Sequence, residues 1–347
     1  MIYFSSRALS TLLFFTTIFG INPLDHAKPK LSDYGFFIGD LADLKPRQGV
    51  IPYNISSKLF SDYALKSRFI VLPTGEKVNY NSDGTFIFPT GSTLIKSFYY
   101  PADLRKPTED IRIMETRLMI NTTDGWIGYP YVWNKSQTDA FLEIAGERLE
   151  VSFINNNGMQ ESINYSVPNF NQCKGCHVNQ NEMKPIGLKS RLLNHEYDYS
   201  EGSMNQLKKW SLLNMVNNLP QLSTIAHTPD YSDPRDGSVD ERARAWIDIN
   251  CAHCHRLGAP GETSGLFLNI EEENPTRLGV LKPPVAAGRG TGELKHTISP
   301  GNPDKSIMIY RMRSTDPGIM MPELGRKLVH KEGIELVSEW IKNMKKN

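Results

Sequence analysis

The sequence predicts a multidomain α+β fold, with an N-terminal β-sandwich-like domain, a connecting segment and a C-terminal all-α domain. The length of 347 residues exceeds that of one small domain and favours two or three. Short apolar runs separated by turn residues fill residues 28–165, as expected of an all-β domain. Residues 236–347 instead begin and end with apolar residues at helical spacing.

The β-rich domain is assigned to residues 28–165. Residues 81–84 (NSDG) and 123–125 (TDG) predict hairpin turns, because Asn, Asp and Gly accept the backbone conformations of tight turns. The many aromatic residues of this region are expected to form a core and cross-strand pairs rather than a docking face. The expected strands are residues 85–88, 93–100, 112–120, 126–133 and 140–144.

The connecting segment is assigned to residues 166–235. Within it, residues 203–217 carry Leu207, Trp210 and Leu213 on one helical face, which predicts a helix. A polar, proline-containing stretch (TPDYSDPRDG) then predicts a linker.

Helices are expected at both ends of residues 236–347. Ser238 and Glu241 form a capping box, which opens a helix whose apolar stripe runs into Cys251. The last helix is predicted by Ile334, Val337, Trp340, Ile341 and Met344, which recur at helical spacing.

All four cysteines fall in two Cys-x-x-Cys-His motifs. Two thiols at this spacing can add to the vinyl groups on one edge of a haem, and the following imidazole can bind the iron. The motifs therefore predict two covalently bound haem c groups. The connecting segment at residues 166–235 is therefore predicted to bind the first haem, and residues 236–347 are predicted to form a cytochrome c-like domain. The attachment residues are Cys173, Cys176, Cys251 and Cys254, and the proximal iron ligands are His177 and His255.

Three other uses of the cysteines compete with haem attachment. A structural zinc site can use two Cys-x-x-Cys pairs, but it needs no His after each pair, and these pairs lie too far apart for a zinc ribbon. A Cys-x-x-Cys disulfide closes a very small loop and stabilises little. A thioredoxin-like motif needs a βαβ pattern that neither motif has around it.

The second haem is expected to have a methionine as its sixth ligand. Met321 precedes Pro322, and the chain between His255 and this pair is long enough to wrap around a haem. A thioether ligand favours the reduced iron and raises the potential. Met320 is the alternative ligand.

The first haem has no clear sixth ligand, and an open position is one alternative. Backbone carbonyls in the loops at residues 185–187 and 257–261 are expected to accept the Nδ1–H of His177 and His255. The candidates for the sixth ligand are Met183, His195, Met204 and Met215. The histidines expected to be ordinary solvated or capping residues are His26, His227, His253, His296 and His330.

Residues 1–27 predict a signal peptide. The uncharged run at residues 8–21 fits the roughly 7–15 residues of a signal core and is short of the ~20 that span a bilayer. An uncleaved anchor is the alternative. The chain is therefore expected to be periplasmic or otherwise exported, with no transmembrane segment in the mature protein. The formal net charge of +1 argues against nucleic-acid binding.

Several further stretches of the sequence, taken together with the two haem motifs, carry a resemblance to a known family. They are residues 59–64 (LFSDYA), 88–91 (FPTG), 185–187 (PIG), 240–245 (DERARA), 284–290 (PVAAGRG) and 320–326 (MMPELGR). This set resembles a bacterial family of exported dihaem cytochrome c proteins, some of which resemble fusions to a glucose/sorbosone dehydrogenase-like propeller. The resemblance covers nearly the whole chain after residue 27 and implies a cytochrome c domain at the C-terminus. It implies no particular substrate.

The expected function is electron transfer, with a separate redox protein, a dehydrogenase or another cytochrome, as partner. The alternative is a dihaem enzyme of peroxidase or oxidase type that uses an open first haem. No catalytic constellation stands out in the sequence, which favours the electron carrier.

Overall fold

The computed structural model describes residues 23–82, 84–285 and 287–345. Most of the predicted signal peptide, residues 1–27, lies outside the described residues. Strand residues (27%) outnumber helical residues (23%). In the described part of the chain, no helix has both the length and the apolar character needed to cross a membrane.

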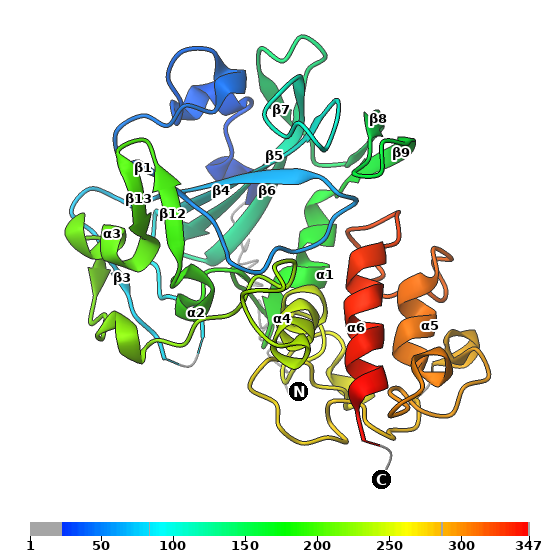
Figure 1. Cartoon of the computed structure of the whole chain (residues 1–347). Coiled ribbons are helices and arrows are strands. Elements are labelled where there is room, and N and C mark those ends of the chain that lie inside the picture. The colour runs from blue at the N-terminus through cyan, green and yellow to red at the C-terminus, as the bar shows by residue number, and fades with distance from the viewer. Residues whose placement is uncertain (1–22, 83, 286, 346–347) are drawn as a thin grey trace, which may run out of the picture.

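A six-stranded antiparallel sheet dominates the N-terminal part of the molecule (Figure 1). Its strand order is β1-β2-β4-β5-β6-β7. Thr122 Oγ1 donates a hydrogen bond to the Gly125 carbonyl at 2.8 Å in the turn between β5 and β6, as the hairpin signal predicts. The strands are β1 (Val50–Tyr53), β2 (Leu65–Val71), β4 (Thr93–Pro101), β5 (Ile111–Thr122), β6 (Gly125–Trp133) and β7 (Ala140–Leu142).

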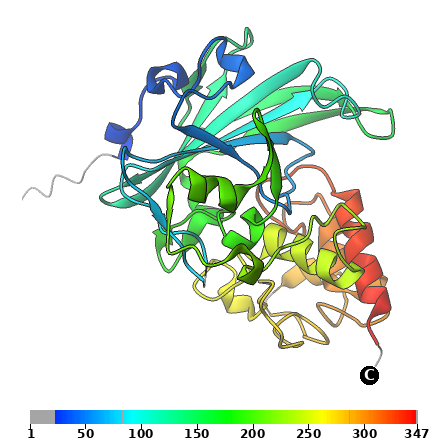
Figure 2. The same ribbon diagram turned by 60° about the vertical axis from the view of Figure 1, so that its left-hand side comes forward.

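The sheet is covered on both faces. On the outer face, Phe69, Ile95 and Leu118 share a core with the N-terminal segment, which contributes Leu31 from a 3-10 turn and Phe36 from the stretch after it. The other, inner face turns toward the C-terminal half of the chain, and Figure 2 shows the sheet on one side of the molecule with the helices below it. Successive residues of a strand point to opposite faces of the sheet. A sheet that is buried on both faces therefore needs apolar residues at odd and even strand positions alike.

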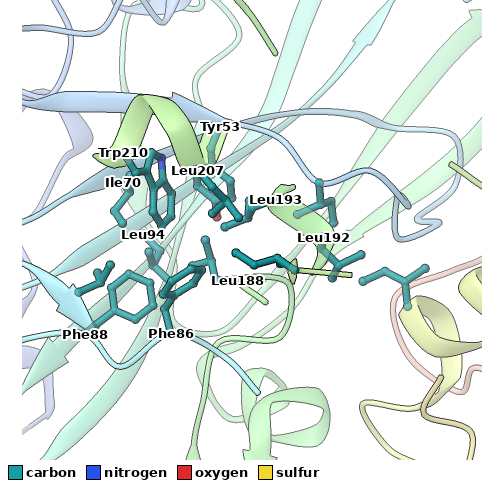
Figure 3. Close-up of a cluster of buried hydrophobic side chains, with 14 residues drawn as sticks. Tyr53, Ile70, Phe86, Phe88, Leu94, Leu188, Leu192, Leu193, Leu207 and Trp210 are labelled. Atoms are coloured by element: carbon teal, nitrogen blue, oxygen red, sulfur yellow. The ribbon is translucent and has the colours of Figure 1, made fainter. Parts of the chain in front are cut away.

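The connecting segment shares a hydrophobic core with the inner face of the sheet (Figure 3). It contains α2 (Ser190–Leu193) and α3 (Gln206–Leu212). Burying each large apolar side chain contributes about 1.5–3 kcal/mol, so this shared core fixes the segment firmly to the sheet. The core includes Tyr53, Ile70, Phe86, Phe88 and Leu94 from the sheet region, and Leu188, Leu192, Leu193, Leu207 and Trp210 from the segment.

The remaining strands form short pairs. β8 (Glu147–Ile154) and β9 (Gln160–Val167) make an antiparallel hairpin beside the sheet. The two-residue strands are β3 (Val78–Asn79) with β14 (Val216–Asn217), and β10 (Val178–Asn179) with β11 (Glu182–Met183). The last pair is β12 (Glu196–Tyr199) with β13 (Gly202–Asn205).

The C-terminal region contains α4 (Val239–Cys251), α5 (Ile307–Arg313) and α6 (Lys331–Asn343). The capping box is confirmed: Ser238 Oγ accepts from the Glu241 backbone N–H, and the Glu241 carboxylate accepts from the Ser238 backbone N–H. α4 and α6 pack against each other, with α5 beside α6 (Figure 1). The predicted apolar stripes of both helices lie in one core, which includes Ala243, Trp246, Ile247, Ile334, Val337, Trp340 and Ile341.

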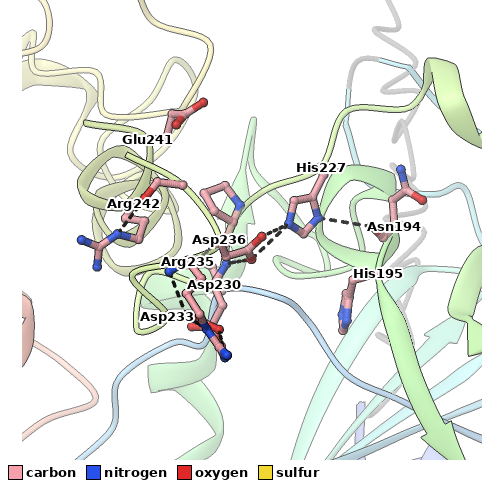
Figure 4. Close-up of polar contacts among 12 residues, drawn as sticks. Asn194, His195, His227, Asp230, Asp233, Arg235, Asp236, Glu241 and Arg242 are labelled. Carbon is pink, nitrogen blue, oxygen red and sulfur yellow. Dashed lines mark hydrogen bonds and ion pairs between the residues drawn. The ribbon is translucent and has the colours of Figure 1, made fainter. Parts of the chain in front are cut away.

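The polar stretch expected as a linker is held to the rest of the fold (Figure 4). The His227 ring contacts both its neighbours: Nε2 lies 3.1 Å from the Asp236 carboxylate and Nδ1 lies 3.2 Å from the Asn194 carbonyl. Asp236 also accepts from the Asp230 backbone N–H at 2.6 Å. The stretch therefore forms a compact turn that leads into α4.

The predicted fold class is wrong. The expected β-sandwich is one large sheet with a separate hairpin, because its strands are buried on both faces by loops and short helices instead of by a second sheet. The expected all-α cytochrome c-like domain at residues 236–347 is not an all-α unit. Between α4 and α5 the chain forms 3-10 turns and irregular loops, since Pro and Gly recur through residues 257–303 and interrupt helices. The domain boundaries themselves stay a prediction.

Two predicted elements also differ in detail. Residues 85–88 form only isolated bridges, Asn79 with Ile87 and Thr85 with Lys189. The helix expected over 203–217 is limited to α3, because the Asn205 side chain caps it by accepting from the Leu207 and Lys208 backbone N–H groups.

Candidate functional site

A cavity of about 280 Å³ lies between the inner face of the sheet, the first Cys-x-x-Cys-His motif and the C-terminal region. Strands β1, β2, β4, β5, β6 and β9 supply one wall, and α4 with residues 321–327 supplies the other. Cys173, Cys176 and His177 line it, and so does Met321. The cavity therefore joins predicted site residues from both halves of the chain.

The first motif forms one helical turn, as its chemistry requires. A 3-10 turn (Phe170–Cys173) continues into α1 (Lys174–His177), so both thiols and the imidazole come from adjacent turns. Asn169 and Gln172 form a capping box that starts this turn. Cys173 packs on β6 at Gly128, where an added Cβ would lie 3.4 Å from the Cys173 sulfur.

His177 is held in the tautomer that a metal ligand needs. Its Nδ1 lies 2.9 Å from the Lys184 carbonyl, so Nδ1–H donates and Nε2 keeps its lone pair. Burial lowers the pKa of His177 to about 4, so the ring is neutral near pH 7. The acceptor is the carbonyl just before the predicted loop at residues 185–187.

The second motif follows directly from α4. Cys251 is the last residue of α4, and burial raises the pKa of its thiol to about 12. Burial lowers the pKa of His255 to about 4, and its Nδ1 lies 3.3 Å from Ser264 Oγ rather than from a carbonyl of the predicted loop. Among the described residues, Cys251, Cys254 and His255 do not belong to the cavity lining.

The two motifs are in contact, although the contacting residues Gly175 and Cys254 are 79 positions apart in sequence. The Cys254 sulfur lies 3.5 Å from the Gly175 carbonyl oxygen. The Gln180 backbone N–H donates to the Gly258 carbonyl at 2.8 Å, and Asn179 Nδ2 donates to the Leu257 carbonyl at 3.0 Å. Nothing in the sequence predicts this contact, because it depends on how the connecting segment docks on the C-terminal region.

His253 is a candidate site residue that the sequence analysis missed. It was expected to be a solvated residue, but it is 6% exposed and lines the cavity. Its Nδ1 has no hydrogen-bond partner in the part of the chain that the structure describes. Ligand atoms of Cys176, His253 and Cys254 all lie within 4.8 Å of one another. The position of His253 inside a Cys-x-x-Cys pair was the available signal.

His330 is also buried rather than solvated. Its side chain is 10% exposed, and it lines the cavity. Trp246 Nε1 donates to its Nδ1 at 2.9 Å, and its ring stacks on Phe60 with 4.2 Å between centroids. His330 therefore supports the wall formed by α4 and α6.

The candidate methionine ligands differ in whether they line the cavity. Met321 lines the cavity, whereas Met320 is 4% exposed and packs elsewhere. Of the candidates for the first haem, Met183 lines the cavity. His195 is instead held by Gln206 at 2.8 Å, and Met215 packs in the core shared by the sheet and the connecting segment. Met204 lies on β13, outside the described cavity lining.

Haem c fits the residues at the first motif. Two thiols and a neutral imidazole face a cavity with largely apolar walls, which Arg68 and Lys96 also line, and neither cation forms an ion pair with a carboxylate of the described residues. When bound, the iron of such a group changes between two oxidation states, and the chain supplies its ligands, burial and orientation. The second motif offers the same donor set, but its Cys251, Cys254 and His255 lie outside the described lining of the cavity that Met321 shares with the first motif.

Comparison with known proteins gives no further assignment. No family model, no curated protein and no solved structure matches this chain. The resemblance to exported dihaem cytochromes therefore stays a prediction from the motifs.

Proposed function

We propose that this chain is an exported dihaem c-type cytochrome that transfers electrons between separate redox proteins. One haem is attached at Cys173 and Cys176, and the other at Cys251 and Cys254. The observation that carries the proposal is the contact between the two motifs, with the Cys254 sulfur 3.5 Å from the Gly175 carbonyl. Electron transfer slows steeply with distance, so two attachment sites in contact favour a relay from one iron to the other.

The surrounding residues support ligand roles for both histidines. Burial keeps His177 and His255 neutral, and a neutral imidazole is the form that binds iron. The Lys184 carbonyl orients His177 and raises the basicity of its free nitrogen. Met321 lines the cavity together with the first motif, so its thioether is available to a haem bound there, and which of the two irons it binds is decided by the variant below.

The direct test is the intact mass of protein made with the cytochrome c maturation machinery. The mass should exceed that of the polypeptide by two haem groups. Cys173→Ala with Cys176→Ala should remove one group, and Cys251→Ala with Cys254→Ala should remove the other. Unmodified thiols in the wild-type protein would contradict the proposal.

Met321→Ala tests the sixth ligand. The variant should lose the thioether-to-iron charge-transfer band and should lower the potential of one haem, because a methionine ligand stabilises reduced iron. Met320→Ala is the matched control, since Met320 is buried outside the cavity lining. The ligand assignment fails if Met320→Ala removes the band and Met321→Ala keeps it.

A metal site is the second candidate function, favoured by the group of Cys176, His253 and Cys254. Thiolate and imidazole ligands of this kind suit Zn²⁺. The two functions exclude each other, because a sulfur bound to a porphyrin as a thioether is no longer a thiolate. Metal analysis decides between them: stoichiometric zinc that His253→Ala removes would support the metal site, and zinc-free protein that keeps both haems in His253→Ala would support the cytochrome.

A further inference from the structure

The inner face of the sheet carries a row of three cations, of which Arg68 is buried and Lys96 and Arg117 are partly buried. Arg68 on β2 lies opposite Lys96 on β4, and Lys96 lies opposite Arg117 on β5. All three line the cavity. Like charges directly opposite each other destabilise a sheet, and burial increases the cost of each charge. The row therefore requires negative charge nearby.

Among the residues that the structure describes, a carboxylate pairs with only one member of the row. Arg117 Nη2 lies 2.6 Å from the Glu115 carboxylate, and Nε lies 2.8 Å from it. Glu115 is fully buried and also accepts from the Tyr165 hydroxyl. In the described ranges, no carboxylate forms an ion pair with Arg68 or Lys96.

Arg68 has an unused donor aimed at this region. It is 5% exposed, and its Nη1 donates to Asn54 Oδ1 at 2.9 Å. Its Nη2 is buried and has no hydrogen-bond partner among the residues that the structure describes. A buried guanidinium nitrogen without a partner destabilises the fold, and an anion bound to it would offset this cost.

Lys96 is in a similar position. Its Nζ lies 4.8 Å from the centroid of the Phe98 ring, and the guanidinium carbon of Arg117 lies 4.3 Å from the same ring. A cation–π contact contributes less than the burial of an ion costs, so the contact with Phe98 does not offset the burial of Lys96. Burial and the neighbouring cations Arg68 and Lys66 lower the pKa of Lys96 well below its usual value. An anion in the cavity would relieve this cost.

We propose that Arg68 and Lys96 form a carboxylate-binding site, and that it takes the propionates of the haem attached at Cys173 and Cys176. The proposal rests on the proposed cytochrome function. Cys173 packs on β6, and β6, β5, β4 and β2 follow one another in the sheet. Arg68 is thus three strand spacings, about 14 Å, from the strand that Cys173 contacts. In haem c the thioether and propionate edges are opposite each other, as are Cys173 and Arg68 across this face.

This assignment gives the sheet a role in cofactor binding. The inner face would form one wall of the first haem site, and its cations would neutralise the propionates. A cation near the haem also disfavours the more positive oxidised iron, so the row would raise the potential of the first haem.

Lys96→Met and Arg68→Met in the holoprotein test the proposal, with Arg112→Met as the matched control. Arg112 is an exposed cation on β5. Each cavity variant should lower the potential of the first haem by about 59 mV, a tenfold change in its reduction equilibrium. The control should change neither haem. Arg68→Lys, which keeps the charge, should restore most of the wild-type potential.

A second readout reports on the propionates directly. Infrared difference spectra between the oxidised and reduced states, recorded with haem carboxylates labelled with carbon-13, should show a labelled carboxylate band that moves in Lys96→Met. An unmoved band together with an unchanged potential in both cavity variants would overturn the proposal. Arg68→Gln replaces Arg68→Met, and Lys96→Gln replaces Lys96→Met, where the methionine variant fails to fold.

Arg68 and Lys96 could also bind the carboxylate of a soluble anion, because it has the same chemistry as a haem propionate. If added acetate or succinate shifts the wild-type potential and Lys96→Met abolishes this response, the site serves a free ligand and the propionate assignment is overturned. A wild-type potential that ignores both anions supports the propionates. Intact mass separates these outcomes from failure of the cytochrome proposal, because that failure leaves no covalent haem in any variant.

Discussion

His330 is a buried histidine that must stay neutral. Its Nδ1 accepts a hydrogen bond from Trp246 Nε1 at 2.9 Å, and a protonated Nδ1 could not accept it. Burial lowers the pKa of His330 to about 4, although Glu332 acts in the opposite direction and Lys66 in the same one. The ring therefore couples the position of α6 to pH.

Acid should destabilise the protein through His330. Its folded-state pKa lies below the value of about 6.5 for a free histidine, so its contribution is complete above pH 6.5 and is lost as the pH falls toward 4. The loss is about 3 kcal/mol at most. His330→Asn keeps an acceptor for Trp246 and should flatten the fall of Tm between pH 6.5 and 4. His296→Asn is the control, and equal slopes in wild type and His330→Asn would contradict the prediction.

The crossing of α4 and α6 depends on a glycine. A Cβ added at Gly333 in α6 would lie 2.5 Å from the Trp246 indole of α4 and 2.7 Å from His330 Nδ1. At the other end of the crossing, Trp340 Nε1 donates to the Asp240 carboxylate at 2.6 Å. The helices are thus in close contact at one end and hydrogen-bonded at the other.

Gly333→Ala should destabilise the protein despite its better helix propensity. The propensity gain is about 1 kcal/mol, whereas overpacking in a core costs about 1–3 kcal/mol. We expect a net loss of about 1 kcal/mol in denaturant unfolding. Glu335→Ala, an exposed change in the same helix, should stay within about 0.5 kcal/mol of wild type. A more stable Gly333→Ala would show that Trp246 moves freely.

The whole molecule is held together by buried polar links between its regions. Arg191 Nη2 in α2 lies 2.7 Å from the Asp248 carboxylate in α4. The Phe60 backbone N–H donates to Asn250 Oδ1 at 2.8 Å, which connects the sheet region to the same helix. These links place the two Cys-x-x-Cys-His motifs relative to each other.

Arg191→Leu should destabilise the molecule strongly. The Asp248 side chain is only 3% exposed, so loss of its partner leaves a buried carboxylate unpaired, at a cost of about 3–5 kcal/mol. Arg191→Leu with Asp248→Leu removes both charges and should lose less than the single variant in the same unfolding measurement. A double variant that loses the sum of both single losses would rule out direct coupling.

Local signals predicted the parts of this fold that depend on neighbouring residues. The capping box at Ser238 and the stripes of α4 and α6 are properties of a few turns, and the structure confirms them. The sandwich prediction failed because the cover of the sheet comes from segments distant in sequence. The contact between the motifs and the cation row on three strands are equally non-local. Lys and Arg within the apolar strands β2, β4 and β5 were the sequence signal for the row.

One wall of the cavity is formed by residues 321–327, close to the C-terminal end of the chain. Asp62, near the start of the sheet, accepts from the backbone N–H groups of Lys327 and Leu328 at 2.6 and 2.7 Å. A chain that emerges from its N-terminus therefore presents Cys173 long before residue 327 can dock. Under the proposed function, a haem attached at Cys173 before residues 327 and 328 dock would enter an open cavity, which the last helix would then close. The contact between the start and the end of the chain therefore determines the order in which the cavity is assembled.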